Sequence, residues 1–261
     1  MGRILISCIV LIIYAAQASP QSVATGKDNC AEIKAIAARL EARIKNWPAL
    51  SRYREANAKV PLPAKHEQRV VFMGDSITDC WVKQESGGFF PGKQYINRGI
   101  AGQTTQQMLV RFRSDVIALK PKVVVILAGT NDLAFVTAPN ALQAIENNLT
   151  SMIELARVNR IRVVLASLLP VSDYGKEKDG KPVIQTTSRP PEQIKALNDW
   201  MKAYAAENGL TYLNYHSAMV DGKGFLRDEL SNDGLHPNDR GYAVMAPIAE
   251  RAIAAAFKWK R

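Results

Sequence analysis

Short apolar runs alternate with amphipathic segments from Arg69 to the end of the chain, and this alternation constrains the fold more than any other feature. The apolar runs are RVVFMG, YINRG, KVVVILAG, IRVVLASLLP and LTYLNY, and the helical stretches lie near residues 104–119, 139–159, 191–208 and 238–257. The run from Val123 to Ala128 has no polar alternation and is rich in β-branched residues, as expected of a strand covered on both faces. The pattern predicts a doubly wound α/β domain with a parallel sheet of five strands.

Turn and breaker residues predict where several of these elements begin and end. Asn208-Gly209 has the composition of a left-handed cap after a helix, and Pro139 suits the first turn of one. Pro247 interrupts the last helical stretch, so we expect a break or kink there. The stretch from 171 to 190 is polar and longer than an ordinary connection, and such loops often flank a functional site.

The first residues have the layout of a secretory signal peptide: a basic residue, an apolar run and the small-residue triplet Ala16-Gln17-Ala18. We expect residues 1–18 to be cleaved, leaving no stable membrane span, since the run is short of the roughly 20 apolar residues that a span needs. The protein is then secreted or periplasmic. Residues 19–65 are predicted to form a helical extension, with an amphipathic helix over 29–46, and residues 66–261 the main domain.

Cleavage would leave two cysteines in the mature chain, Cys30 and Cys80. In an oxidising compartment they could form a disulfide, which would close a loop of roughly 50 residues and stabilise the fold by up to about 4 kcal/mol. Two buried thiols would look the same in sequence, so both alternatives stay open.

Charge and motif content exclude several function classes. The chain has 34 Lys and Arg against 24 Asp and Glu, but the two signs are interspersed and no nucleic-acid motif occurs, so we expect no nucleic-acid partner. His66 and His216 have no carboxylate at a matching spacing, and the absence of an H-x-x-x-H pattern disfavours a metal hydrolase. The stretch GGFFPGK lacks the Ser or Thr of a phosphate-binding loop, and we expect Phe89 and Phe90 to line an acyl pocket instead.

Polar residues and glycines follow three of the predicted strands. They are Gly74-Asp75-Ser76 after the first strand, Asn97 to Gly102 after the second, and Gly129 to Asp132 after the third. Because the carboxyl ends of parallel strands meet at one edge of a sheet, where ligands bind, we expect these segments to line one rim. Asp75 and Asp132 are predicted to be structural, holding their loops through hydrogen bonds to backbone amides.

A fourth segment, SNDGLHPND, places Asp233 and His236 three residues apart before the last helix. This spacing lets the carboxylate bind one ring nitrogen of His236 while the other nitrogen faces a nucleophile, and Ser76 is the natural partner. Attack on a carbonyl also requires fixed donors for the developing oxyanion. The amides of Ser76 and Gly102 and the carboxamide of Asn131 are predicted to supply them.

These four segments resemble the four signature blocks of the SGNH, or GDSL, hydrolase family. The blocks read GDSIT, NRGIAGQT, GTND and DGLHP, and they follow the family's order over about residues 69–257. The resemblance implies a flavodoxin-like three-layer sandwich, hydrolysis of esters or thioesters through an acyl-enzyme, and neither a metal nor an organic cofactor. Carried over by position, it makes Ser76 the nucleophile and an oxyanion donor, Gly102 and Asn131 further donors, His236 the base and Asp233 its orienting acid.

The leading hypothesis is a secreted serine esterase that acts on a small-molecule, carbohydrate or lipid ester. One alternative is an O-acyltransferase that passes the acyl group to polysaccharide hydroxyls, and another is an inactive carbohydrate-binding module on the same scaffold. The absence of a G-x-S-x-G motif argues against the α/β-hydrolase fold. The acyl and alcohol groups stay open, because they depend on loops 82–94, 132–138 and 171–190.

Overall fold

The computed structural model describes residues 33–38, 41, 44, 46–83, 88–135, 141–176 and 180–258. The chain divides into two compact units, Met1–Lys45 and Asn46–Arg261. In the first unit residues 33–38 are helical, whereas the predicted signal peptide at 1–18, Cys30 and Pro139 lie outside the described residues. Residues 46–65, which the sequence placed in the extension, belong to the compact unit that contains the sheet.

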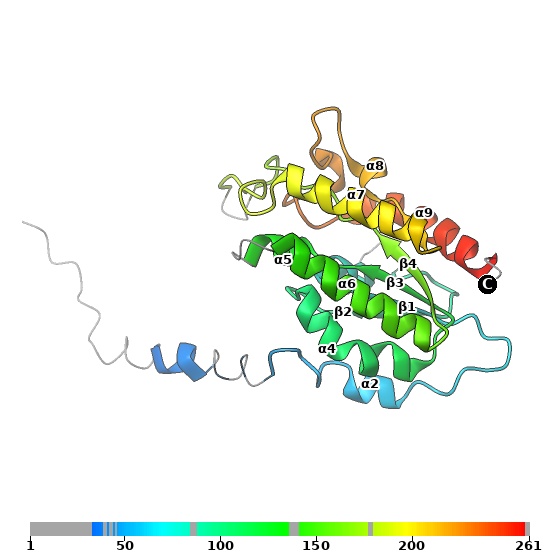
Figure 1. Ribbon diagram of the computed structural model, residues 1–261. Helices are drawn as coiled ribbons and strands as arrows, with labels where there is room; N and C mark the ends of the chain where they lie inside the picture. The colour runs from blue at the N-terminus through cyan, green and yellow to red at the C-terminus, as the bar shows by residue number, and fades with distance from the viewer. Residues whose placement is uncertain are drawn as a thin grey trace, which may run out of the picture. The chain divides into compact units, whose positions relative to one another are not determined.

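A five-stranded, all-parallel sheet forms the centre of the second unit, in the order β2-β1-β3-β4-β5 (Figure 1). The strands are β1 (Val70–Gly74), β2 (Tyr95–Gly99), β3 (Val123–Leu127), β4 (Arg162–Ala166) and β5 (Thr211–Leu213). This is the strand order of flavodoxin-like folds, in which the chain reverses its direction of progress beside β1. The predicted parallel α/β sheet is therefore confirmed.

Helices cover both faces of the sheet, and every residue of β1 and β3 is therefore buried. The helices are α2 (Arg54–Ala58), α3 (Ser76–Asp79), α4 (Thr105–Asp115), α5 (Thr130–Phe135), α6 (Ala141–Val158), α7 (Pro191–Glu207), α8 (His216–Met219) and α9 (Asp239–Lys258). Single 3-10 turns span Cys80–Lys83, Ile117–Leu119 and Asp228–Leu230. Helix α6 packs between α4 and α7, while α9 packs on β3, β4 and β5. The result is a three-layer sandwich.

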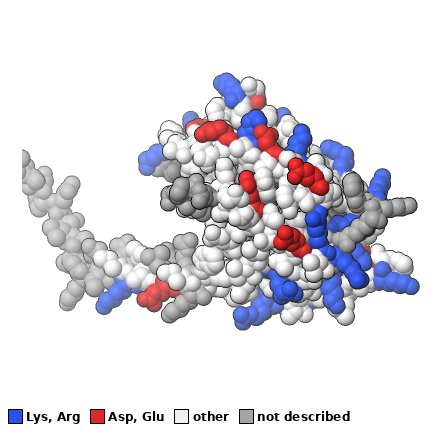
Figure 2. Space-filling view, in the orientation of Figure 1, with Lys and Arg blue, Asp and Glu red and all other residues white. Residues whose placement is uncertain are grey.

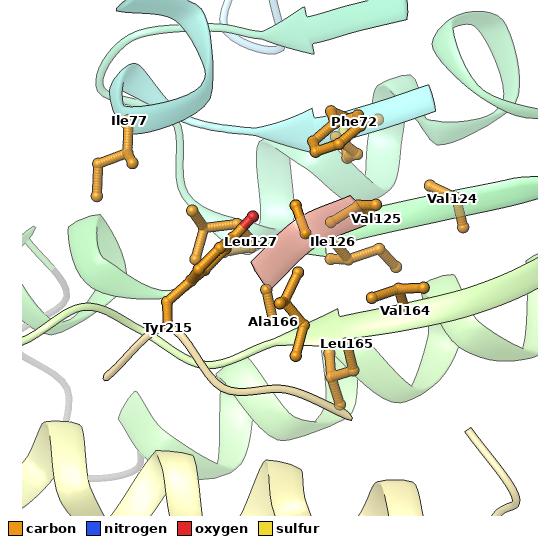
Figure 3. Close-up of a cluster of buried hydrophobic side chains, with 14 of the residues drawn as sticks. Phe72, Ile77, Val124, Val125, Ile126, Leu127, Val164, Leu165, Ala166 and Tyr215 are labelled. Atoms are coloured by element: carbon orange, nitrogen blue, oxygen red, sulfur yellow. The ribbon is translucent and has the colours of Figure 1, made fainter. Parts of the chain in front are cut away.

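The core explains why these segments become strands. Val70, Val123, Val124 and Val164 are completely buried, and their β-branched side chains suit the surface of a covered sheet. Figure 3 shows side chains of β1, β3 and β4 lying close together, with the ring of Tyr215 beside the end of β3. Gly209, with φ +62°, ends α7 in the left-handed conformation that the sequence predicted.

The structure differs from two local predictions. Helix α9 runs without a break through Pro247, because its buried stripe, which includes Met245 and Ala249, packs on the sheet and offsets a cost of about 3 kcal/mol for an interior proline. Phe89 and Phe90, which we expected to line an acyl pocket, lie in an aromatic cluster of the core. They pack on Phe72 with ring-centroid distances of 5.0 and 5.2 Å, in the core beneath the sheet's first strand.

Within the described residues, no helix has both the length and the apolar character required to cross a membrane. On the face shown in Figure 2, basic and acidic side chains are interspersed. The formal charge of +10 is therefore not gathered into a single basic patch on that face.

Candidate active site

Ser76 lies at the carboxyl end of β1, where it begins helix α3. The exit from the strand is tight, because a side chain on Gly74 would place its Cβ 2.1 Å from Oγ1 of Thr78. Asp75 caps the helix: its Oδ1 accepts the amide N–H of Ile77 at 2.9 Å. The strand end and the cap together fix the backbone around the serine, which is 8% exposed.

The structure brings His236 and Asp233 to this serine. Nε2 of His236 lies 2.8 Å from Oγ of Ser76, and Nδ1 lies 2.6 Å from Oδ2 of Asp233. Oδ1 of Asp233 accepts the amides of Leu235 and His236 at 3.0 and 2.8 Å, so the carboxylate organises the turn that carries the imidazole. Gly234, with φ +72°, makes this turn possible.

Asp233 and Asp75 have opposite pKa shifts. Burial raises the pKa of Asp233, but hydrogen bonds from the side chain and backbone of His236 outweigh it and hold the pKa well below its usual range. Asp233 is therefore ionised whenever His236 needs a counter-charge. Burial raises the pKa of Asp75 to about 6, against the opposing hydrogen bond from the amide of Ile77. The two acids sit in different environments and serve different purposes.

Gly102 and Asn131 follow the two strands that flank β1. Gly74 is in register with Gly99 of β2 on one side and with Leu127 of β3 on the other. Gly102 is exposed, with φ +77°. Asn131 is 4% exposed, and its Nδ2 donates one hydrogen to the carbonyl of Gln103 at 3.0 Å. A carboxamide carries two donor hydrogens, and the second has no partner among the residues that the structure describes.

Asp132 holds the turn that carries Asn131, in the structural role predicted for it. Its carboxylate accepts the amide of Thr105 at 2.9 and 3.1 Å and the Thr105 hydroxyl at 2.5 Å, which joins α5 to the start of α4. Burial raises the pKa of Asp132, and the hydrogen bonds from Thr105 oppose that rise.

The loop from 171 to 190 packs directly on the turn that carries Asp233, as a loop flanking a site would. Nε2 of Gln185 donates to the Asp233 carbonyl at 3.1 Å, and Nη1 of Arg189 donates to Oε1 of Gln185 at 2.9 Å. A side chain on Gly175 would place its Cβ 2.7 Å from Cα of Asp233. The backbone at Gly175 therefore packs closely against the turn that carries Asp233 and helps to hold it in place.

A groove of about 900 Å³ opens beside His236. Polar and acidic residues predominate in its lining: Cys80, Asp228, Glu229, Asn232, Asp239 and Arg240. Both His236 and Asp233 are half-buried and reach this groove. Among the residues that the structure describes, no group of three or more His, Cys, Asp or Glu side chains is arranged to hold a metal ion.

Sequence reasoning missed several buried polar residues beneath the site, Gln103, Arg111 and Arg189 among them. One of them left a signal. Met108, Arg111, Phe112 and Asp115 fall on one helical face, so an arginine and an aspartate four residues apart interrupt an apolar stripe. Such a pair on the buried side of a helix indicates a buried ion pair with a specific task.

Comparison with known proteins agrees with this arrangement. The model of the GDSL-like Lipase/Acylhydrolase family matches residues 72–244. A crystal structure of a GDSL-like lipase from Bacteroides thetaiotaomicron superposes with a TM-score of 0.70 at 39% identity, covering 80% of this chain and 98% of that one.

Two curated relatives extend the comparison. An acetylxylan esterase from Geobacillus stearothermophilus is 26% identical over 224 residues, 74% of this chain and 96% of the esterase. The lipoprotein YqeF from Bacillus subtilis, whose function is uncharacterized, is 38% identical over 79 residues, 29% of this chain, so the match spans only 32% of that protein. The family match and the structural similarity show that the chain belongs to the GDSL-like Lipase/Acylhydrolase family and is an ester-hydrolysing enzyme.

Proposed function

We propose that the protein is an exported serine esterase that forms an acyl-enzyme on Ser76. The observation that carries the proposal is the continuous hydrogen-bond chain from Oγ of Ser76 through His236 to Asp233, with distances of 2.8 and 2.6 Å. A serine hydroxyl becomes a nucleophile when a base lies within this reach and a third group orients the base.

In the proposed reaction, Oγ of Ser76 attacks the ester carbonyl while Nε2 of His236 takes the hydroxyl proton. The tetrahedral oxyanion is bound by the amides of Ser76 and Gly102 and by the second Nδ2 hydrogen of Asn131. Collapse breaks the bond to the alcohol, which leaves with the proton from His236. A water molecule, deprotonated by the same imidazole, then attacks the acyl carbon. The bond from that carbon to Oγ of Ser76 breaks, His236 returns the proton to Oγ, and the acid is released. Ester and water are consumed, and acid and alcohol are formed.

Asp233 serves this reaction by orienting the imidazole and stabilising the imidazolium. Its low pKa supports that role, because an ionised carboxylate at Nδ1 keeps the free lone pair of the neutral ring at Nε2, facing Ser76. No metal or organic cofactor takes part in the proposed steps.

The substrate class that fits best is an ester of a hydroxyl-rich alcohol. Carboxylates and carboxamides such as Asp228, Asn232 and Asp239 line the groove that His236 also lines. Such groups bind hydroxyls by hydrogen bonds. The similarity to an acetylxylan esterase supports the same class. The signal-like segment at 1–18 supports export, which mass spectrometry of the mature amino terminus would test.

The test compares the wild type with Ser76→Ala on nitrophenyl esters of increasing acyl length and on an acetylated oligosaccharide. Ser76→Ala is expected to lose at least about a thousand-fold in kcat/KM and all labelling by a fluorophosphonate, while the fold persists. Ser151→Ala is the matched control, since that hydroxyl lies on α6 and, among the described residues, bonds the carbonyl of Asn147 alone. Near-wild-type turnover by folded Ser76→Ala would refute the mechanism, and a rate preference for long-chain nitrophenyl esters would refute the carbohydrate class.

A further inference from the structure

Arg111 is completely buried on helix α4, which is unusual for a side chain that always carries a charge. Taking a guanidinium out of water costs several kcal/mol unless hydrogen bonds and a counter-charge replace the lost solvent. Asp115, one helical turn away, supplies the counter-charge at 3.1 Å from Nη1. A buried ion pair by itself adds little to stability. The role of Arg111 is therefore indicated by the hydrogen bonds that its guanidinium donors make beyond Asp115.

Those donors reach three different segments at the carboxyl edge of the sheet. Nη2 donates to the carbonyl of Gly74 at 3.0 Å, and Nη1 donates to the carbonyl of Arg98 at 2.8 Å. Nε donates to Oε1 of Gln103 at 2.5 Å. Gly74 ends β1 two residues before Ser76, and Gln103 directly follows Gly102. One rigid guanidinium thus contacts the segments that carry two of the proposed oxyanion donors.

Gln103 connects Arg111 to the third donor. Its side chain, 3% exposed, accepts from Arg111, while its main-chain carbonyl accepts Nδ2 of Asn131 at 3.0 Å. The same side chain donates from Nε2 to the carbonyl of Pro48. The hydrogen on Nδ2 that bonds Gln103 sets the direction of the other one, because both lie in the plane of the carboxamide. The position of Gln103 therefore determines the direction of the second Nδ2 hydrogen of Asn131.

We propose that Arg111, acting through Gly74 and Gln103, is the positioning residue that aligns Ser76, Gly102 and Asn131 for binding the oxyanion. The inference rests on the proposed function and adds a residue in contact with none of the reacting atoms. Oxyanion donors are effective only within about 2.7–3.1 Å of the developing charge, so their relative placement matters more than their presence. An arginine suits this task better than a lysine, because its planar fork fixes several acceptors in one geometry.

The test perturbs the link at Gln103, so that the buried ion pair of Arg111 and Asp115 is retained. Gln103→Leu removes the acceptor for Nε, and the loss of about 1–3 kcal/mol from an unpaired buried donor leaves an ordinary fold intact. We expect kcat to fall about 10- to 100-fold with KM within about two-fold of wild type. Gln103→Glu keeps an acceptor for Arg111, although it adds a buried negative charge and turns an oxygen toward the Pro48 carbonyl, so it should recover part of kcat relative to Gln103→Leu.

Gln143→Leu is the matched control, since the exposed Gln143 donates from Nε2 to Oδ1 of Asn147 on α6 at 3.1 Å and does not touch Arg111. It should leave kcat unchanged. A second comparison combines Gln103→Leu with Asn131→Ala. Because Gln103 is proposed to act partly through Asn131, the double variant should lose less than the product of the two single losses.

Each outcome separates this inference from the proposed function. Wild-type kcat in folded Gln103→Leu, a change confined to KM, equal losses in Gln103→Leu and Gln103→Glu, or fully multiplicative losses with Asn131→Ala would each overturn the positioning role. If the wild type fails to hydrolyse any ester, or folded Ser76→Ala stays active, the proposed function itself fails.

Discussion

Asp75 caps the helix that begins at Ser76, and its burial makes the ionised form of its carboxyl group unfavourable. It is 1% exposed; Oδ1 caps helix α3, whereas Oδ2 has no hydrogen-bond partner among the described residues. Arg189 is 6% exposed and, among the described residues, makes no hydrogen bond to Asp75. It stabilises the ionised carboxylate of Asp75 by charge attraction across a longer distance. The cap requires an oxygen at Oδ1 but not a charge, so the two properties can be separated by substitution.

Asp75→Asn should stabilise the protein at neutral pH relative to wild type, and progressively less as the pH falls. The pKa of Asp75 is raised from 3.8 to about 6, so the folded state binds more protons than the unfolded state between these values. Wild-type stability therefore falls as pH rises through this window, by roughly 2 units at about 1.4 kcal/mol each, on the order of 3 kcal/mol. Asparagine keeps Oδ1 and does not titrate. Urea unfolding of both proteins from pH 4 to 7 measures the difference, and parallel stability curves would contradict it.

At the scale of elements, the site is assembled from turns that glycine makes possible, and two of these turns differ in what surrounds them. A Cβ on Gly234 would lie 2.0 Å from the carbonyl of Ser172, so the turn of Asp233 is closed by a neighbouring segment. A Cβ on Gly102 would meet nothing within 4 Å. The open space over Gly102 is what the proposed reaction needs for a bound acyl group.

Gly102→Ala should reduce activity far more than it reduces stability. The backbone at φ +77° disfavours a side chain by about 1–2 kcal/mol, and the new methyl group would project where the substrate carbonyl must approach. We expect kcat/KM to fall about 10²-fold or more.

Gly224→Ala is its matched control, because φ is +90° there and its Cβ would also meet nothing within 4 Å. Both variants should lose similar thermal stability in calorimetry, while only Gly102→Ala loses esterase activity. Equal activities in the two variants would show that the space over Gly102 is not used by substrate.

The elements themselves were predictable because their signals are local. The run from Val123 to Ala128 predicts a covered strand, and Asn208-Gly209 predicts the end of a helix. Both predictions use neighbouring residues alone. The break predicted at Pro247 does not occur, because the packing that keeps the helix continuous there is tertiary and cannot be seen in the local sequence. The contact of Ser76 with His236 joins residues 160 positions apart, and only the four motifs together made its prediction possible.

The partners of the supporting residues were beyond the reach of such signals, even though the spacing of Arg111 and Asp115 indicated a buried ion pair. The side chains of Gln103 and Arg111 donate to main-chain carbonyls, and every residue type presents the same carbonyl, so no pattern of side chains reveals the pairing. Gln185 and Arg189 lie in a loop whose composition predicts only exposure, yet Arg189 is buried beside the acid–base turn.

At the scale of the whole molecule, residues 46–65 complete the domain rather than precede it. The hydroxyl of Tyr53 donates to the carbonyl of Gly99 at the end of β2. Asn57 accepts from Nε of Arg98 at 2.8 Å and donates to Asp115 at 2.8 Å, which ties it to the ion pair of Arg111. This segment thus supplies partners for buried polar groups directly beneath the oxyanion donors.

A chain that begins at Asn46 should keep its fold and activity, whereas one that begins at His66 should be severely destabilised. The second truncation leaves Arg98, Asp115 and the Nε2 group of Gln103 without their partners from residues 46–65. Each unpaired buried group costs about 1–3 kcal/mol, and each kcal/mol lowers the melting temperature of a domain this size by about 2–4 °C.

Calorimetry of the two truncated chains and the full chain measures the difference, with esterase rates recorded at a temperature where all three are folded. Tyr53→Phe and Asn57→Ala in the full chain are the point-variant counterparts, and Asn57→Ala should be the more costly because it leaves two charged groups short of a partner. A chain beginning at His66 that melts within a few degrees of the full chain would show that the buried ion pair of Arg111 and Asp115 holds the site without this segment.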